Sequence, residues 1–296
     1  MNNAKSSLIV LNYNDYDMTQ KLVDNVKNYE SIDTIVIVDN CSNNQSYYNL
    51  RSYYKNNIKV HVIKTDKNGG YSYGNNYGIK YAIDKFNPSV IAVANPDVLF
   101  TEETFTHARD TVLLKSYAMV SAVMHDSDDK EVLQPYWSEL PSYKFDLLMN
   151  FVWFRRKIYK EKHWVNNQRE IMDGCMMPGS LYIFNTDALK KIDFFDEGVF
   201  LFSEEAIISN KLLKNGYKIG LMTKYSYLHM HSYTIKKSVK EIDRFILQTK
   251  SRYYYQKKYN NIRGIKLLML RIANCIGIFE FSACLFIKRA IGMNNV

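Results

Sequence analysis

Short apolar runs alternate with amphipathic stretches along the first hundred residues of the chain. The apolar runs are rich in Val and Ile and predict buried strands over 7–12, 33–39, 60–64 and 90–100, the last broken by Asn95-Pro96-Asp97. The stretches between them predict helices over 18–29, over 46–55 and up to residue 86. Strands that alternate with helices in this way indicate an α/β fold with a parallel sheet and right-handed crossovers.

Acidic residues follow two of these predicted strands. Asp39 ends the second run, and Asp97 follows the buried part of the fourth. Ligands of open α/β sheets bind outside the carboxyl ends of the strands, so a carboxylate there can hold a metal ion against a phosphate. The sequence Asn-Pro-Asp is also good turn chemistry, so this pattern alone leaves an ordinary capped turn open.

A glycine-rich and asparagine-rich run covers residues 68–78. Gly70, Gly74 and Gly78 recur every four residues and would lie along one side of the start of a helix, where backbone can approach a ligand or a strand closely. The run has no G-K-[ST] and does not fit G-x-G-x-x-G. A classical ATP or dinucleotide site is therefore disfavoured.

The second half of the chain has a less regular pattern. We predict a helix over 102–115, an apolar segment over 119–124, a loop feeding a strand over 173–185, a helix ending at Asn215-Gly216, and sheet segments over 217–222 and 225–229. Residues 145–164 mix aromatic and basic side chains. That mixture suits a membrane interface or an acceptor groove, and equally a surface helix with one buried aromatic stripe.

Two pairs of residues in this half are candidates for chemistry. Glu204 and Glu205 stand at a predicted helix start, where the helix dipole favours carboxylates, but one of them can instead be a general base whose pKa the other shifts. His229 and His231 occupy alternate positions at a predicted strand end and could offer an imidazole to a metal.

The tail over 238–296 is helical in pattern and basic. Its apolar stretch 265–291 is interrupted by Arg271 and Glu280, so we expect it not to cross a membrane. With Lys266, Lys288 and Arg289 it could lie in the plane of an anionic surface. Packing on the sheet or on a second copy, as a homodimer, fits the pattern equally well.

Composition adds limits on partners and compartment. The formal charge of +9 favours an anionic partner, such as a nucleoside diphosphate or an acidic leaflet, and no nucleic-acid recognition motif is present. Four scattered cysteines without a C-x-x-C pair suggest neither a zinc site nor a disulfide framework. The first residues do not resemble a signal peptide, so we expect a cytoplasmic protein.

Several motifs follow one another in an order that resembles a known family. They are Val38-Asp39-Asn40-Cys41-Ser42, the run 68–78, Asn95-Pro96-Asp97-Val98, Gly179-Ser180, Phe195-Asp196-Glu197, Phe202-Ser203-Glu204-Glu205 and His229. Residues 6–235 resemble the GT-A glycosyltransferases of family two, particularly the rhamnosyltransferase-like and capsule or O-antigen branch of bacteria. The resemblance implies a Rossmann-like, mostly parallel sheet flanked by helices over 1–235, with a helical, basic and amphipathic extension over 236–296.

The resemblance also implies roles for residues. Residues 1–100 would form a nucleotide-binding half and 101–235 an acceptor-binding half. The nucleotide would lie near Leu11, Asn12, Tyr13, Asp39, Asn40, Gly70, Asn76, Asn95, Pro96 and Asp97. Asp97 and His229 would ligate Mn²⁺ or Mg²⁺, Glu205 or else Glu204 would be the base, and Gly179, Ser180, Glu204 and His231 would lie near the sugars.

The activity implied is inverting, metal-dependent transfer of a sugar from a UDP- or dTDP-sugar to a hydroxyl of a growing, lipid-linked surface polysaccharide, at the inner face of the cell membrane. Three positions depart from the family: Asn95 replaces the first acid of D-x-D, and Ile207 and Lys211 stand where an acid and an arginine are usual. Two alternatives remain. A sugar nucleotidyltransferase is disfavoured because LNYNDYD after the first strand lacks that family's Gly-rich basic signature, whereas a non-catalytic sugar- or nucleotide-binding subunit is supported only by Ile207.

Overall fold

A computed structural model describes residues 4–126, 139–158, 168–174, 176–230 and 240–290. Its centre is a nine-stranded sheet with the order β3-β2-β1-β4-β8-β6-β9-β5, and β7 pairs with β9. The strands are β1 (Ser6–Asn12), β2 (Thr34–Asp39), β3 (Val60–Lys64), β4 (Val90–Ala94), β5 (Val98–Phe100), β6 (Tyr117–His125), β7 (Ile171–Asp173), β8 (Leu181–Asn185) and β9 (Lys218–His229).

The sheet is mostly parallel, as predicted. The pairing places β1, β2, β3, β4, β6 and β9 in one direction and β5, β7 and β8 in the other. The segments predicted separately over 217–222 and 225–229 are one strand, β9, with an irregularity where its pairing to β6 shifts from Met222 to Ser226. The register sets Asn12 beside Asp39. It also sets Val98 beside His229, which brings His229 close to Asp97, the residue before Val98.

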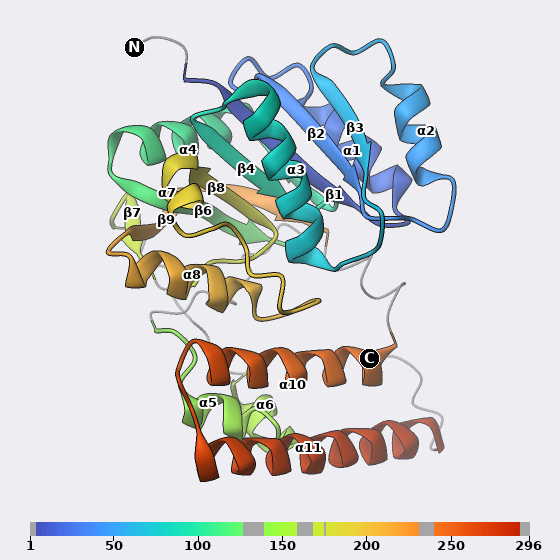
Figure 1. Ribbon diagram of the computed structural model, residues 1–296, viewed down its shortest axis with the longest axis vertical. Coiled ribbons are helices and arrows are strands. Elements are labelled where there is room, and N and C mark those ends of the chain that lie inside the picture. Colours follow the sequence, from blue (N-terminus) through green and yellow to red (C-terminus); the bar gives the residue numbers. More distant parts are fainter. Residues whose placement is uncertain (1–3, 127–138, 159–167, 175, 231–239, 291–296) are drawn as a thin grey trace.

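Helices cover both faces of the sheet (Figure 1). They are α1 (Tyr16–Val26), α2 (Ser46–Tyr53), α3 (Tyr71–Phe86), α4 (Glu102–Leu114), α7 (Thr186–Lys191) and α8 (Glu204–Lys214). Because side chains alternate along a strand, Leu8 of β1 enters one apolar core and Ile9 the other. The helix predicted over 18–29 begins and ends earlier, at Tyr16 and Val26.

The glycine spacing of α3 has the predicted effect. A Cβ on Gly78 would lie 2.5 Å from Cγ2 of Val38 and 2.7 Å from Cγ2 of Ile9, and a Cβ on Gly74 would collide with Leu11. Glycines at these positions therefore let α3 approach β1 and β2 closely.

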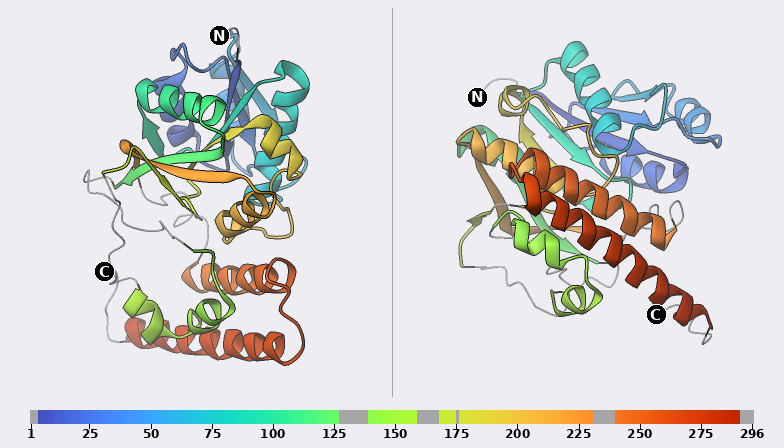
Figure 2. Two further views of the ribbon diagram at one scale, coloured as in Figure 1. Left: turned by 90° about the vertical axis from the view of Figure 1, so that its left-hand side faces the viewer. Right: turned by 60° about the horizontal axis from the view of Figure 1, so that its bottom comes forward.

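A separate layer of helices lies below the sheet domain in Figure 1 and in the left view of Figure 2. It contains α5 (Tyr143–Leu148), α6 (Val152–Ile158), α10 (Glu241–Lys258) and α11 (Gly264–Ala290). The backbone N–H of Val152 donates to Oε2 of Glu280 at 3.1 Å, and Gly277 of α11 packs directly on the backbone of Asn150. Part of the predicted acceptor half, α5 and α6, thus joins the C-terminal helices in space. Residues 159–164 of the aromatic and basic stretch lie outside the described residues.

Helix α11 contains a segment, Gly264–Ile287, that is long and apolar enough to cross a membrane by length and composition, with a mean hydropathy of 1.7. By length and composition, therefore, the expectation that Arg271 and Glu280 make this segment too polar to cross a membrane is wrong. Buried core helices meet the same criteria, but only 17% of this apolar window is buried.

Candidate functional site

The loops after β1 and β2 are held together by Asp39. Its Oδ2 accepts from Nδ2 of Asn12 at 2.7 Å, and its Oδ1 accepts from the backbone N–H of Ser42 at 2.9 Å. Asn12 and Asp39 are completely buried. Asn12 and Asp39, both predicted to bind nucleotide, therefore hold together the loops after β1 and β2. The half-buried Leu11 and Tyr13 are the neighbours of Asn12 in the sequence.

Asn40 and Gly70 connect this edge to the second half of the chain. Nδ2 of Asn40 donates to the carbonyl of Gly70 at 3.0 Å. Gly70 has φ +88°, and a Cβ there would collide with the carbonyl of Phe200. The N–H of Tyr71 donates to that same carbonyl at 3.0 Å. The start of α3, which the glycine-rich run predicted as a helix start, thus lies against the segment that leads into Glu204.

Asn76 is engaged within the protein. Its Nδ2 donates to the carbonyl of Phe195 at 2.9 Å and to Oε1 of Glu197 at 2.8 Å, and its Oδ1 accepts from the N–H of Phe195 at 3.1 Å. Both amide hydrogens are used, so the side chain secures the loop after α7. Its predicted contact with nucleotide stays a prediction.

Asp97 and His229 form a pair at the ends of β4 and β9. Nε2 of His229 lies 3.3 Å from Oδ1 of Asp97, and only 4% of the Asp97 side chain and 13% of the His229 side chain are exposed. The N–H of Met230 donates to the carbonyl of Asp97 at 2.9 Å, which holds the two strand ends together. Pro96 and Asp97 form the turn between β4 and β5, and Asn95 directly precedes it.

The pair fits a divalent metal. Mn²⁺ accepts both carboxylate and imidazole ligands, and Mg²⁺ favours one or two carboxylates together with substrate phosphates. Among the residues that the structure describes, no group of three or more His, Cys, Asp or Glu side chains could hold a metal. Two protein ligands would leave the other coordination positions of the metal to phosphate oxygens, as expected for an ion that binds together with a nucleotide-sugar. His231 lies outside the described residues.

Gly179 and Ser180 join the pair to the two glutamates. The N–H of Asn95 donates to the carbonyl of Ser180 at 2.9 Å, and a Cβ on Gly179 would lie 2.8 Å from Oε1 of Glu205. The turn before β8 therefore touches the Asp97 loop on one side and the Glu205 carboxylate on the other. The structure brings the two predicted acidic centres to the same edge of the sheet.

Glu204 and Glu205 begin α8, and none of the ion pairs between described residues involves either of them. Burial and the neighbouring Glu205 raise the pKa of Glu204, and burial raises the pKa of Glu205. Among the described residues, Oε2 of Glu204 has no hydrogen-bond partner. Glu204 is buried and Glu205 is half-buried, so Glu205 is the more accessible of the two. Raised carboxyl pKa values of this kind suit proton transfer near neutral pH.

The backbone that precedes the glutamates is strained. Phe202 has φ +71° and Ser203 φ +66°, and neither residue is glycine. Consecutive residues in the left-handed region cost about 1–3 kcal/mol each and persist only where the surroundings impose them. The surroundings here include Ser251 of α10, whose hydroxyl donates to the carbonyl of Leu201 at 2.7 Å.

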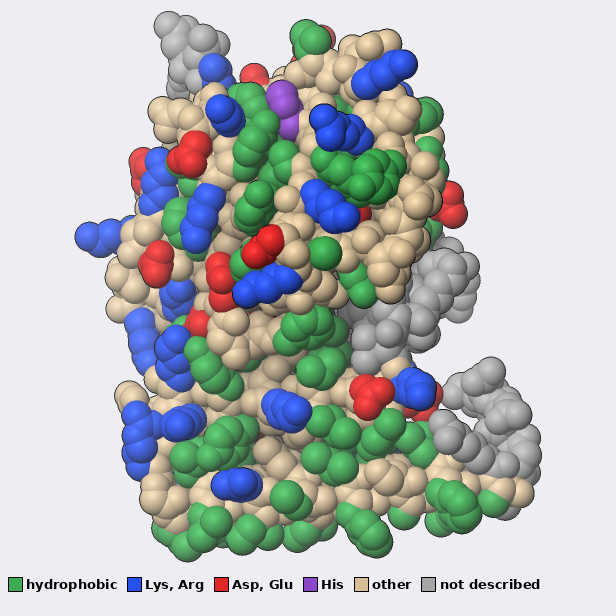
Figure 3. Space-filling model, turned by 45° about the vertical axis from the view of Figure 1, so that its right-hand side comes forward, with side chains coloured by type: hydrophobic (Ala, Val, Ile, Leu, Met, Phe, Trp, Pro, Cys, Tyr) green, Lys and Arg blue, Asp and Glu red, His purple; other side chains and the backbone are tan. Residues whose placement is uncertain are grey.

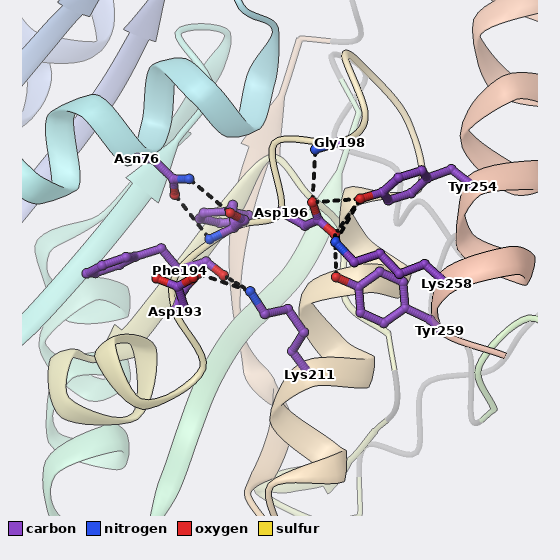
Figure 4. A network of polar contacts seen from close by, with 10 residues as sticks. Asn76, Asp193, Phe194, Asp196, Gly198, Lys211, Tyr254, Lys258 and Tyr259 are labelled. Carbon is purple, nitrogen blue, oxygen red and sulfur yellow. Dashed lines mark hydrogen bonds and ion pairs between the residues drawn. The ribbon is translucent and has the colours of Figure 1, made fainter. Parts of the chain in front are cut away.

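The two departures from the family in α8 lie away from this edge. Ile207 is buried against Tyr255 in a small core between α8 and α10. Nζ of Lys211 donates to the carbonyls of Asp193 at 3.1 Å and Phe194 at 2.5 Å (Figure 4). Ile207 therefore has a packing role, and Lys211 holds the backbone of residues 193–194.

Asp196 forms a network that the sequence did not indicate (Figure 4). Its Oδ2 accepts from Nζ of Lys258 at 2.8 Å and from the hydroxyl of Tyr259 at 2.5 Å, and the hydroxyl of Tyr254 lies 3.0 Å from each carboxylate oxygen. Burial alone would raise the pKa of Asp196, but Lys258 and these hydrogen bonds lower it to about 2. The network fastens α10 to the loop that leads to Glu204, next to a hollow of about 410 Å³.

Tyr71 is a further site residue that sequence reasoning missed. Its hydroxyl donates to the carbonyl of Gly179 at 2.7 Å, and burial together with Glu204 and Glu205 raises its pKa. It directly follows Gly70, but nothing in the spacing separates it from the other 23 of the chain's 24 tyrosines.

Comparison with known sequences identifies two relationships. The family model described as Glycosyl transferase family 2 matches residues 7–186. The low-salt glycan biosynthesis hexosyltransferase Agl10 of Haloferax volcanii is 22% identical over 214 residues, which make up 72% of this chain and 63% of Agl10. This chain thus spans less than two thirds of the length of that relative.

Solved structures with a similar fold include a mannosyltransferase, GalNAc-T7 and S. aureus TarS. The mannosyltransferase PcManGT of Pyrobaculum calidifontis, in complex with GDP-Man and Mn²⁺, aligns with a TM-score of 0.60 and 15% identity over 97% of this chain and 75% of that chain. GalNAc-T7 with UDP, GalNAc and Mn²⁺ gives 0.62 and 14% over 92% and 54%. S. aureus TarS 1–349 with UDP-GlcNAc gives 0.54 and 15% over 91% and 79%. At these identities the likeness concerns the fold alone.

Proposed function

Because this chain belongs to glycosyl transferase family 2 and has a GT-A fold, we propose that it transfers a sugar from a nucleoside diphosphate to a hydroxyl, with inversion at the anomeric carbon. One observation carries the proposal. The Asp97–His229 pair and the Glu204–Glu205 pair flank the same Gly179–Ser180 turn, at the edge where the parallel strands end. Ligands of open α/β sheets bind at such an edge.

Glu205 is the proposed base. It is more accessible than Glu204, and it lies against Gly179, where the lack of a Cβ leaves room beside its carboxylate. A carboxylate in this position would take the proton from the acceptor hydroxyl as that oxygen attacks the anomeric carbon. Burial raises the pKa of Glu205, and burial together with Glu205 raises the pKa of Glu204, because two neighbouring carboxylates do not ionise easily together.

Asp97 and His229 are the proposed ligands of Mn²⁺ or Mg²⁺. Such an ion neutralises the negative charge of a departing diphosphate as a Lewis acid. The chain's own part is to hold Oδ1 of Asp97 and Nε2 of His229 at one strand end by the Met230–Asp97 backbone hydrogen bond. Asn95 in place of the first acid lowers the negative charge of the site, which would make metal binding depend on the donor.

The proposed donor is a UDP- or dTDP-sugar, and the proposed acceptor is a growing, lipid-linked surface glycan. Similar folds have been solved with UDP-GlcNAc and with GDP-Man, which supports a nucleotide-sugar without choosing its base. The name of Agl10 records glycan biosynthesis for that relative, which supports a glycan acceptor. If the acceptor is linked to a lipid, the protein would act at the inner face of the cell membrane.

Isothermal titration of nucleoside diphosphates with and without Mn²⁺ tests the metal role. Asp97→Ala should lose Mn²⁺-dependent affinity by about tenfold or more, because one charged ligand is removed. Asp84→Ala, at an exposed position of α3, is the matched control and should bind as the parent protein does. Unchanged Mn²⁺-dependent affinity in Asp97→Ala would refute the role of Asp97.

A further inference from the structure

The outward side of α11 is a continuous apolar surface. Its exposed side chains include Phe279, which is 77% exposed, Phe286 at 73% and Ile265 at 68%. The full set is Ile265, Leu268, Met269, Ile272, Ile276, Phe279, Phe286 and Ile287. Figure 3 shows hydrophobic side chains along the lower edge of the molecule, where α11 runs. We refer to these eight residues as the α11 face.

The α11 face is one stripe of the helix. With 3.6 residues per turn, all eight side chains fall within an arc of about 100°. Leu270, Ala273, Asn274 and Gly277 are buried on another side, where Nδ2 of Asn274 donates to the carbonyl of Thr249 at 3.3 Å. The helix therefore has one side in the protein and a different, apolar side in solvent.

The exposed charges on α6, on α11 and at the turn before α11 are positive, whereas α10, which also packs on α11, exposes Glu241 and Asp243 in its first turn. Helix α6 contacts α11 and exposes Trp153, Arg156 and Lys157. Exposed charged side chains at the turn before α11 and on α11 itself are Arg263, Lys266 and Arg271. Among the described residues of α6, α11 and the turn 259–263, the single acid is Glu280, and it accepts a hydrogen bond from Val152.

We propose that the α11 face and α6 together seat the protein in the plane of an anionic lipid leaflet. An apolar stripe bordered by cations, with a tryptophan at its edge, is the signature of a helix that lies at a membrane interface. Phosphate headgroups would meet Arg156, Lys157, Arg263, Lys266 and Arg271.

Two other occupants fit less well. A span across the bilayer would have to break the contacts of Asn274, Gly277 and Glu280 with α10 and the α5–α6 segment. A second copy of the chain packed face to face would bring the cations of α6, α11 and the turn 259–263 against one another, because the described residues of these three segments expose no acid. An anionic leaflet complements both the apolar stripe and its cationic border.

Flotation of the full chain with phosphatidylcholine vesicles, with and without phosphatidylglycerol, tests the proposal. The parent protein should float with the anionic vesicles, and binding should fall at high salt. The double variant Ile276→Ser, Phe279→Ser should lose about tenfold or more of this binding, because two large apolar side chains no longer enter the leaflet. Both positions are exposed, so the fold should persist, and circular dichroism checks it.

Control variants separate the outcomes. Ile58→Ser removes a side chain that is 96% exposed in another part of the molecule and should leave flotation unchanged. Arg156→Glu with Lys157→Glu should reduce binding to anionic vesicles only. Equal binding of the parent and the double variant would overturn the proposal. So would resistance of the bound protein to alkaline carbonate, which indicates a spanning helix, or a dimer in solution that the double variant abolishes while neither protein floats.

The seating surface is independent of the proposed chemistry. Asp97→Ala should float as the parent protein does, and Ile276→Ser with Phe279→Ser should keep Mn²⁺-dependent nucleotide binding. Failure of the metal titration with normal flotation would refute the transferase proposal alone, and the reverse result would refute the membrane proposal alone.

Discussion

Asp196 and Glu204 lie in the same loop region, yet the structure shifts the pKa values of their carboxyl groups in opposite directions. Lys258 and three hydroxyl or N–H groups surround Asp196 and lower its pKa to about 2, against the effect of burial. Burial and the adjacent Glu205 raise the pKa of Glu204. Environments that separate two carboxyl pKa values in this way separate their roles.

The difference between the two carboxyls is a difference of partners. Helix α10 supplies Tyr254 and Lys258 to Asp196, whereas it meets the start of α8 through Ser251 and the apolar ring of Tyr255. Asp196 therefore links the two layers, and the glutamates are the carboxyls that we propose for proton transfer. The following variants test this division.

The largest expected effect is on catalysis. Glu205→Gln should lower kcat by about 10²–10⁴, because the amide cannot accept the acceptor's proton. Glu103→Gln, at an exposed position of α4, should retain full activity in the same transfer assay. Donor binding by Glu205→Gln should stay close to that of the parent. If Glu204→Gln loses activity while Glu205→Gln keeps it, the base is Glu204.

Asp196→Asn should act on stability. The amide keeps the shape of the side chain but loses its charge beside Lys258, and we expect a loss of about 1–3 kcal/mol in the free energy of unfolding. Urea denaturation measures this loss. Lys250→Met, which removes an exposed lysine from α10, is the control for loss of charge in that helix. A parent-like midpoint for Asp196→Asn would mean that the network does not anchor α10.

The pH dependence of stability should have opposite signs at the two carboxyls. Asp196, with a lowered folded pKa, stabilises the fold above its ordinary pKa, and this contribution is lost as pH falls toward about 2. Glu204, with a raised folded pKa, favours the fold at low pH, and this contribution is lost as pH rises through the raised value. Thermal melts should show Glu204→Gln more stable than the parent on the alkaline side. Parallel melting curves across the pH range would contradict the assignment.

Tyr254→Phe should have the smallest effect. It removes one hydroxyl from Asp196 and leaves Lys258 and Tyr259 in place, so about 0.5–1.5 kcal/mol of stability should be lost. The same urea denaturation measures it, and Tyr253→Phe, on the same helix, is the control. A loss of stability as large as that of Asp196→Asn would show that the Tyr254 hydroxyl, and not the ion pair with Lys258, links α10 to Asp196.

Periodicity and turn chemistry in the sequence determined much of the sheet domain. The strand Val60–Lys64 has the predicted limits, the Asn215-Gly216 end of α8 is present with φ +77° at Gly216, and glycines at every fourth position of α3 face the sheet. These features depend on neighbours within a few residues, so local pattern is sufficient to predict them. The motif order was also enough to indicate the family.

Only the tertiary structure decided which residues meet. The contact of Gly179 with Glu205, the bond of Tyr71 to Gly179 and the tie between Asp196 and Lys258 join positions that are 26, 108 and 62 residues apart. The exposed side of α11 was likewise undecided by its sequence, because an apolar stripe suits a core, a partner or a membrane alike. Such contacts depend on how separate elements pack, which composition and periodicity do not encode.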